Sequence, residues 1–330
     1  MHDLDPTIPA VEVAGLVREY KGGIRAVDGL DLAVAAGEIY GFLGPNGAGK
    51  TTSVRILTTL LRPTEGTARV AGHDVVSDAD AVRRQIGVAL QEAAIDPLMT
   101  GRELLVMQGA LHGLRSADAR RRAKELLERV GLTQAADRRV GGYSGGMRRR
   151  LDLALALVHR PRVLFLDEPT TGLDPTSRSA LWREVRALND EGTTVFLTTQ
   201  YLEEAEQLAD RVGIIASGKL VAEGTPAALK ARVGQPTLHV ELVDADEAGR
   251  AREALAPLGD LEPAASDQPT RIALRAAAGH GAIAPAIRLL DEADVEVESV
   301  EVETPTLDDV FAAVTGSYLE GAAAAAAPTR

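Results

Sequence analysis

Apolar residues in this chain gather in short runs, separated by longer segments in which they recur every three or four positions. Short apolar runs predict buried strands, and the longer periodic segments predict helices. Their alternation is typical of an α/β layer fold. The expected strands are 11–20, 26–34, 39–43, 67–70, 86–90, 163–166, 194–197, 212–216 and 219–222. The expected helices are 52–61, 78–84, 100–111, 116–130, 144–157, 175–190, 201–209 and 225–233.

Changes in this pattern suggest how the chain is divided into domains. Residues 1–9 are polar and carry proline, so we expect them to be disordered. Residues 10–233 form one expected domain, within which about 91–160 are mainly helical. Gly234-Gln235-Pro236 follows as a linker. Residues 234–316 then predict a small α/β domain, and 317–330 an alanine-rich tail. Within the small domain we expect strands 237–243, 270–275 and 295–303 and helices 246–257, 282–293 and 307–314.

The most informative stretch is 39–52, which reads IYGFLGPNGAGKTT. An apolar strand is followed by Gly44-Pro45-Asn46-Gly47-Ala48-Gly49-Lys50-Thr51, which fits G-x-x-x-x-G-K-[ST], and then by a helix. Backbone N–H groups can converge on a polyphosphate only where no Cβ intrudes, which explains the glycines. Lys50 can reach the β- and γ-phosphates, and the Thr51 hydroxyl can bind Mg²⁺. The alternative is an ordinary glycine-rich turn between a strand and a helix.

A second candidate lies at 163–168, an apolar strand that ends in Asp167 and Glu168. The carboxyl end of a strand beside a phosphate loop is where Mg²⁺ would sit in such a sheet. Asp167 is suited to hold the metal through water, and Glu168 to orient or deprotonate the attacking water. Taken alone, the same pattern also fits a strand cap.

A third candidate is Ser144-Gly145-Gly146, at the start of an expected helix. Such a helix start offers a second phosphate site, and the alternative is a simple N-cap. Along this helix Met147 and Leu151 are expected to face the core. The arginines at 148–150 are expected to stay solvated or paired with polar groups.

Composition narrows the possible functions. The chain has 330 residues, 45% of them apolar, enough for about two domains with sizeable cores. Its net charge of −12 argues against nucleic acid as a partner. It has no cysteine, which excludes disulfides, thiolate metal sites and thiol catalysis, and its six histidines lack metal-site spacing. No apolar run reaches the roughly 18–20 residues of a membrane span, so we expect a soluble cytoplasmic chain.

Taken in order, these motifs resemble those of the ATP-binding subunits of ABC transporters, over about residues 11–233. The resemblance implies a P-loop ATPase domain with a mixed sheet core, an antiparallel β subdomain and a helical subdomain, followed by the small α/β domain. It also implies an ATPase that uses ATP and Mg²⁺ to energise a separate membrane permease, at the cytoplasmic face of the membrane.

The resemblance further implies roles for single residues. Tyr20 matches the aromatic residue that stacks on adenine, and Gln91 a glutamine that binds Mg²⁺ near the permease contact, expected over 91–111. Two subunits would close head to tail, so that the signature 144–146 of one covers the γ-phosphate held by the other. The implied nucleotide-binding residues are Tyr20, Gly44, Pro45, Asn46, Gly47, Ala48, Gly49, Lys50, Thr51, Thr52, Gln91, Ser144, Gly145, Gly146 and, in the D-loop, Asp174. The implied metal ligands are Thr51, Gln91 and Asp167, and the implied catalytic residues are Glu168, Gln200 and Lys50.

Three segments are similar to a narrower group, the daunorubicin-resistance type of drug exporter subunit. They are YSGGMRRRLDLA at 143–154, LTTQYLEEAE at 197–206 and TPTLDDVFAAVTG at 304–316. This similarity implies export of a drug or an antibiotic-like compound without naming it.

The chain departs from the family pattern at Gln200, where most members have histidine. Glutamine can donate a hydrogen bond to the γ-phosphate but cannot carry positive charge. We therefore expect slow but real hydrolysis. The alternative is that ATP only joins two subunits and turnover is negligible.

Two other functions stay open at this stage. The ATP unit also occurs in importers, whose appended domain is often an all-β barrel rather than the α/β domain expected here. It also occurs in soluble ATPases of translation or DNA repair. Those typically carry two ATP units or zinc-binding cysteines, and this chain has one phosphate loop and no cysteine.

Overall fold

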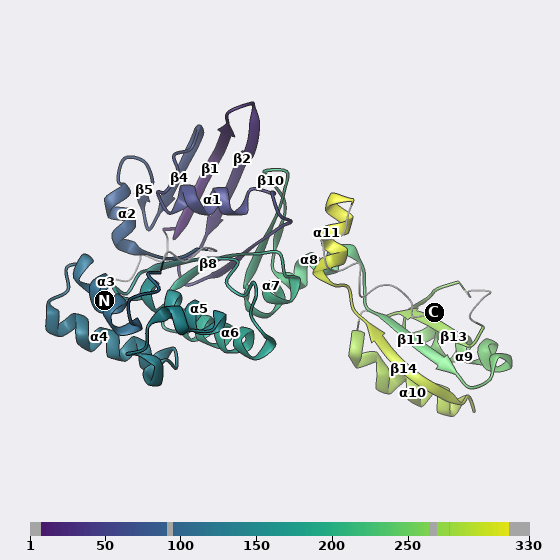
Figure 1. Cartoon of the computed structure of the whole chain (residues 1–330). Coiled ribbons are helices and arrows are strands. Elements are labelled where there is room, and N and C mark those ends of the chain that lie inside the picture. Colours follow the sequence, from purple (N-terminus) through teal and green to yellow (C-terminus); the bar gives the residue numbers. More distant parts are fainter. Residues whose placement is uncertain (1–7, 91–94, 264–268, 277, 317–330) are drawn as a thin grey trace. The chain divides into compact units, whose positions relative to one another are not determined.

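The structure is a computed structural model that describes residues 8–90, 95–263, 269–276 and 278–316 (Figure 1). Contacts between residues divide the chain into two compact units, one ending at Pro226 and the other beginning at Ala227. The domain limits expected from the sequence stay predictions. In the described part of the chain, no helix has the length and apolar content needed to cross a membrane.

A six-stranded sheet forms the centre of the first unit. Five of its strands are parallel, and β10 pairs antiparallel with β9 at one edge. Its residues in β3, β7 and β8 are all buried, as expected for a sheet covered on both faces. The strands, in spatial order, are β10 (Lys219–Gly224), β9 (Arg211–Ala216), β3 (Ile39–Leu43), β8 (Thr194–Thr199), β7 (Val163–Asp167) and β6 (Ile86–Ala89).

Successive residues of these strands enter two different cores. Leu164, Leu166 and Leu197 belong to a core shared with the helical segments. Phe165 and Phe196 belong to a core on the other face, where their ring centroids lie 5.5 Å apart. This is the side-chain alternation of a strand, and it lets one sheet hold both halves of the unit together.

The second core is closed by an antiparallel sheet with the order β2-β1-β4-β5, and α1 lies between the two sheets (Figure 1). Gly22 and Gly23 form the turn between β1 and β2 with φ of 94° and 78°, values that glycine adopts without strain. The four strands are β1 (Val11–Tyr20), β2 (Ile24–Val34), β4 (Glu65–Val70) and β5 (His73–Asp74).

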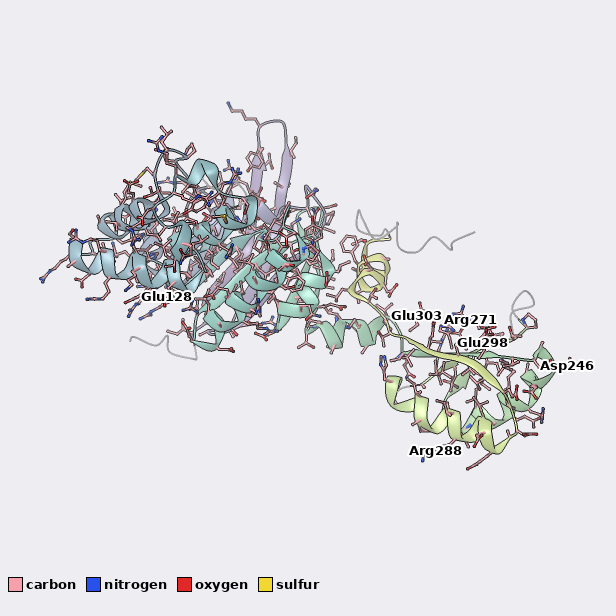
Figure 2. The ribbon with its side chains drawn as sticks, turned by 60° about the horizontal axis from the view of Figure 1, so that its bottom comes forward. Glu128, Asp246, Arg271, Arg288, Glu298 and Glu303 are labelled. Carbon is pink, nitrogen blue, oxygen red and sulfur yellow. The ribbon has the colours of Figure 1, made fainter. Side chains whose placement is uncertain are left out.

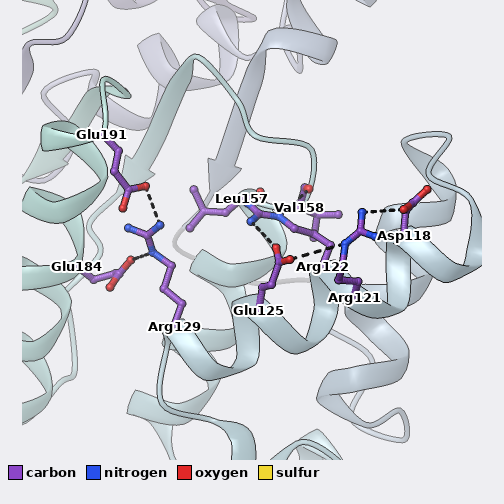
Figure 3. A network of polar contacts seen from close by, with 9 residues as sticks. All are labelled: Asp118, Arg121, Arg122, Glu125, Arg129, Leu157, Val158, Glu184 and Glu191. Atoms are coloured by element: carbon purple, nitrogen blue, oxygen red, sulfur yellow. Dashed lines mark hydrogen bonds and ion pairs between the residues drawn. The ribbon is translucent and has the colours of Figure 1, made fainter. Parts of the chain in front are cut away.

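The expected helices of this unit are present. Thr100 and Glu103 form a capping box at the start of α3. The helices are α1 (Lys50–Leu57), α2 (Ala79–Gln85), α3 (Gly101–Leu111), α4 (Ser116–Arg129), α5 (Gly145–Ala156), α6 (Pro175–Asp190) and α7 (Leu202–Leu208). Figure 3 shows how two arginines of α4, Arg122 and Arg129, bind neighbouring segments.

The second unit contains a four-stranded antiparallel sheet with the order β12-β13-β11-β14. One face packs on α9 and α10 through Leu238, Val240 and Leu242. Arg271 and Glu303 lie on the opposite face, whereas Arg288 extends from the outer side of α10 (Figure 2). Its elements are α8 (Pro226–Val233), β11 (Thr237–Leu242), α9 (Ala248–Leu255), β12 (Asp260–Leu261), β13 (Arg271–Arg275), α10 (Ile283–Glu292), β14 (Val297–Glu303) and α11 (Leu307–Thr315).

The structure corrects several expected boundaries. The helix expected at 52–61 begins at Lys50 and ends at Leu57, because Thr59 takes a left-handed φ of 65°. The helix expected at 246–257 is regular only from Ala248 to Leu255 and has 3₁₀ turns on both sides. The two-residue strands β5 and β12 are too short for a periodic pattern and were not predicted.

Candidate active site

The loop between β3 and α1 has the backbone shape that its glycines predict. A Cβ on Gly44 would lie 2.4 Å from the Ile215 carbonyl oxygen, and one on Gly49 would lie 2.3 Å from that of Ala26. Gly49 also has a φ of 110°, in the region that favours glycine. Since a side chain would clash at both positions, the glycines let the chain turn directly into the N-terminus of α1.

Lys50, the first residue of α1, folds back over this loop. Its side chain is 4% exposed, and its Nζ donates to the carbonyl oxygens of Gly44 at 2.6 Å and Pro45 at 3.1 Å. Nζ also lies 3.4 Å from Oε1 of Glu168. Burial lowers the pKa of Lys50, and the nearby carboxylates of Glu168 and Asp167 oppose this effect. A cation is therefore held at the centre of the loop.

Asp167 ends β7 as expected and is 1% exposed. Its Oδ1 accepts a hydrogen bond from Thr51 at 3.3 Å and another from the Thr198 hydroxyl. Its Oδ2 is buried and, among the described residues, has no hydrogen-bond partner. A buried carboxylate oxygen left in this way is costly unless a cation or a donor satisfies it.

The donor set around this oxygen fits Mg²⁺, which prefers carboxylate, hydroxyl and water oxygens. Thr51 and Asp167, two of the expected ligands, lie next to each other here. The third expected ligand, Gln91, lies outside the described residues.

Glu168 adopts an unusual backbone conformation, with a φ of 47°. Its backbone N–H donates to the Thr198 carbonyl oxygen at 3.1 Å, and its side chain is close to Lys50. The residue is 8% exposed. The turn after β7 therefore directs this carboxylate toward the phosphate loop instead of along the strand.

A cavity of about 410 Å³ adjoins these groups. It joins Tyr20, at the end of β1, to the phosphate loop and to Glu168, although these lie far apart in the sequence. Tyr20 is 38% exposed, and the Arg18 guanidinium lies 4.9 Å from its ring centroid. The lining residues are Tyr20, Ile24, Ala26, Pro45, Asn46, Gly47, Gly49, Lys50, Thr51, Thr52 and Glu168. This volume lies within the range of small-molecule sites.

The segment Ser144-Gly145-Gly146 does not reach this cavity. The Ser144 side chain caps α5 by accepting the Met147 backbone N–H at 3.2 Å, the N-cap alternative raised by the sequence. Gly145 lines a separate cavity of about 200 Å³, which Glu168 also borders. Within one copy of the chain, the second glycine motif and the phosphate loop thus border different cavities.

Asp174 and Gln200 also lie outside the nucleotide-sized cavity. Asp174 caps α6 and accepts from the Ser177 hydroxyl at 2.6 Å and its backbone N–H at 2.9 Å, which lowers the pKa of Asp174. Gln200 follows β8 directly and is half-buried. Because β8 lies between β3 and β7, Gln200 emerges at the same sheet edge as the phosphate loop and Glu168.

Two residues of this region were not predicted as part of the site. Thr198 binds Asp167 through its hydroxyl and Glu168 through its carbonyl oxygen. Arg149 donates to the Asp167 backbone carbonyl at 2.9 Å. The role of Thr198 could have been suspected from the polar pair Thr198-Thr199, which ends an apolar strand. The contact of Arg149 joins residues that are distant in the sequence, so no local pattern predicts it.

Comparison with known proteins gives consistent matches. Residues 27–171 match the family described as ABC transporter. The daunorubicin/doxorubicin resistance ATP-binding protein DrrA of Streptomyces peucetius is 52% identical over 308 residues, 93% of this chain and 92% of that protein. The linearmycin resistance ATP-binding protein LnrL of Bacillus subtilis is 34% identical over 305 residues, 92% of this chain and 97% of that protein.

Solved structures agree with the fold. An ATP-binding cassette solved as a dimer in a post-hydrolysis state, with ADP and phosphate, aligns with a TM-score of 0.61 and 27% identity. The alignment covers 65% of this chain and 98% of that one. The structure of an ATP-binding subunit of an ABC transporter aligns with a TM-score of 0.62 and 26% identity, covering 68% of this chain and 92% of that one.

Proposed function

Because this chain belongs to the family of ATP-binding subunits of ABC transporters, we propose that two copies of it close on ATP and drive a drug-exporting permease. Family membership makes it the ATP-hydrolysing subunit, and the expected resemblance and fold class are confirmed. One observation carries the proposal. The phosphate loop, Lys50 and Glu168 border a single cavity of about 410 Å³ that also reaches Tyr20.

In this proposal the cavity takes the nucleotide. The Tyr20 ring stacks on adenine, and the backbone N–H groups of 44–52, other than at Pro45, surround the phosphates. Phosphate oxygens replace the carbonyls of Gly44 and Pro45 as acceptors for Lys50. The left-handed glycines and the start of α1 at Lys50 support this assignment.

Thr51 and Asp167 would hold Mg²⁺, with Gln91 as a further ligand. The support is the buried Asp167 Oδ2, which has no hydrogen-bond partner among the described residues. When bound, the metal neutralises charge on the phosphates.

Hydrolysis requires a water molecule aligned with the γ-phosphate. Glu168 is the proposed general base, because its carboxylate is directed toward the loop and lies beside Lys50. Gln200 is the proposed hydrogen-bond donor to the γ-phosphate. Since the amide is neutral, it stabilises the developing negative charge less than a cationic side chain would, and slow turnover follows.

The site is completed by a second copy in this proposal. Ser144 and Gly145 are exposed, and Gly145 borders a different cavity from the phosphate loop, so one copy alone does not bring both motifs to one nucleotide. A head-to-tail homodimer brings the signature of each copy to the γ-phosphate bound by the other. Asp174, exposed at the start of α6, would lie at the same contact.

The transported compound is proposed from relatives whose names state resistance to daunorubicin, doxorubicin or linearmycin. These names favour an exporter over the importer and soluble-ATPase alternatives. The chain would act at the cytoplasmic face of the membrane, bound to a separate permease.

The test is transport in inside-out vesicles that contain this chain and the permease encoded beside it. We expect ATP-dependent uptake of daunorubicin, and no uptake with Lys50→Ala. Absence of both uptake and co-purification with the permease would contradict the proposal.

A further inference from the structure

A largely buried arginine, Arg149, contacts the backbone on both sides of Glu168. Its side chain is 12% exposed, and all three of its guanidinium nitrogens donate hydrogen bonds. Nε donates to the Pro169 carbonyl oxygen at 2.9 Å, Nη2 to that of Asp167 at 2.9 Å, and Nη1 to that of Leu90 at 2.6 Å. Nη1 also lies 3.2 Å from Oδ2 of Asp152 on the same helix.

These acceptors come from separate parts of the fold. Asp167 ends β7, Pro169 belongs to the turn that carries Glu168, and Leu90 follows β6 and precedes Gln91. The donor stands on α5, the helix that begins directly after Ser144. Because the acceptors are backbone carbonyls, the bonds fix the path of the chain on both sides of Glu168 and do not depend on neighbouring side-chain rotamers.

The positive charge of Arg149 also interacts with three nearby acidic side chains. Burial lowers the pKa of Arg149, and the carboxylates of Asp152, Asp167 and Glu204 oppose this effect. All three acids are at most 8% exposed. A buried acid without a cation beside it is strongly disfavoured, so Arg149 stabilises this group of carboxylates together.

Arg149 does not belong to the nucleotide cavity. It lines the smaller cavity of about 200 Å³ with Glu168, whereas Asp152 lines another of about 390 Å³ beside Leu90. The arginine therefore touches neither the proposed nucleotide site nor the phosphate loop. Its bonds hold the segment that must present Glu168 to water.

From these contacts we infer that Arg149 is a positioning residue for hydrolysis, which fixes the Asp167–Pro169 turn to the signature helix α5. The inference rests on the proposed function. A misplacement of about 1 Å at a reacting group can cost about 100-fold in rate. Loss of Arg149 therefore changes kcat and leaves the affinity for ATP almost unchanged.

The experiment compares three variants of the full chain. For Arg149→Gln we expect kcat to fall about tenfold or more, with KM for ATP within about twofold of wild type. Arg149→Lys keeps the positive charge but cannot form the same set of hydrogen bonds as the planar guanidinium. Compared with Arg149→Gln, it should restore more of the thermal stability than of kcat. The control is Arg122→Gln, which removes a half-buried guanidinium of α4 that donates to the Leu157 and Val158 carbonyls (Figure 3).

A second readout does not depend on turnover. Hydrogen–deuterium exchange of the nucleotide-free protein should rise over 163–171 in Arg149→Gln and stay at the wild-type level there in Arg122→Gln. Equal kcat losses in the two variants at equal loss of Tm, or unchanged exchange over 163–171, would overturn the inference. A wild-type protein that binds ATP without turnover would contradict the proposed hydrolysis, and the exchange comparison would still decide the role of Arg149.

Discussion

Glu168, the proposed general base, shows how much of the proposed chemistry depends on one residue's backbone. Its φ of 47° lies in a region that costs non-glycine residues about 1–3 kcal/mol. The bond from its N–H to the Thr198 carbonyl oxygen, at 3.1 Å, holds the conformation. Motif order predicted the identity of this carboxylate but not its direction, because that direction depends on a strand 30 residues further along the chain.

We expect Glu168→Gln to lower ATP turnover by about 100-fold or more while ATP binding persists. The amide keeps the shape of the side chain but cannot accept the proton of the attacking water. Turnover and fluorescent-nucleotide affinity measured on one preparation check this. Glu128→Gln is the matched control, since that glutamate lies exposed on α4 (Figure 2). Near-normal turnover in Glu168→Gln would assign the base to another residue.

A second change at the residue scale concerns Gln200. We expect Gln200→His to raise kcat by about tenfold, because a protonated imidazole adds positive charge near the γ-phosphate where an amide adds none. Steady-state ATPase activity checks this, with Gln207→His on the exposed side of α7 as the control. An unchanged kcat would mean that a step other than the chemical one limits turnover.

At the scale of elements, the order and type of the main strands and helices could be predicted. Continuous apolar runs such as 39–43 and 163–166 are what a sheet covered on both faces requires, and both appear as strands. Element ends were less predictable, because α1 stops at a left-handed Thr59 that no local pattern announces. The bonds of Arg149 were not predictable, since they join α5 to carbonyls up to 59 residues away.

His159, between α5 and β7, links elements in a way that makes stability depend on pH. Its Nε2 donates to the Ile86 carbonyl oxygen of β6 at 2.9 Å. Its ring stacks on that of His112, which follows α3, with the ring centroids 3.8 Å apart. Its Nδ1 is buried and, within the described ranges, has no hydrogen-bond partner. Burial, followed by the charges of His112 and Arg122, lowers the pKa of His159 to about 4.

A histidine whose pKa is lower in the folded protein contributes stability at neutral pH that is lost as pH falls through about 6.5 to 4. From pH 7.5 to 5 this loss is about 2 kcal/mol. Wild type should therefore lose about 2 kcal/mol more of its free energy of unfolding between pH 7.5 and 5 than His159→Gln does. Urea denaturation at the two pH values measures this difference. His280→Gln, at an exposed histidine, should behave as wild type. Equal pH dependence of wild type and His159→Gln would contradict the assignment.

At the scale of the whole molecule, the two glycine motifs of one copy border different cavities. The cavity of about 410 Å³ is lined by the phosphate loop and Glu168, and the cavity of about 200 Å³ is lined by Gly145 and Glu168. Glu168 borders both. A partner copy that places its signature against the phosphate loop would enclose the nucleotide beside Glu168, the proposed general base. Hydrolysis would then depend on dimer formation.

Ser144→Arg tests this connection. A long charged side chain at the signature should block closure, because it would occupy the space of the γ-phosphate in the other copy. In the Glu168→Gln background we expect ATP to convert the protein to a dimer, measured by sedimentation or light scattering. Adding Ser144→Arg should abolish that dimer and leave the ATP affinity of the single copy within about twofold, since Ser144 lies outside the nucleotide cavity.

The substitution also removes the N-cap of α5, which costs about 1 kcal/mol, so folding must be controlled. Ser116→Arg, at the exposed start of α4, introduces the same side chain into the same subdomain and should leave the ATP-dependent dimer intact. If Ser144→Arg still dimerises with ATP, the signature does not meet the partner's nucleotide. Hydrolysis would then have to take place within a single copy. Ser144 would have no part in it, because it caps a helix and lines neither cavity.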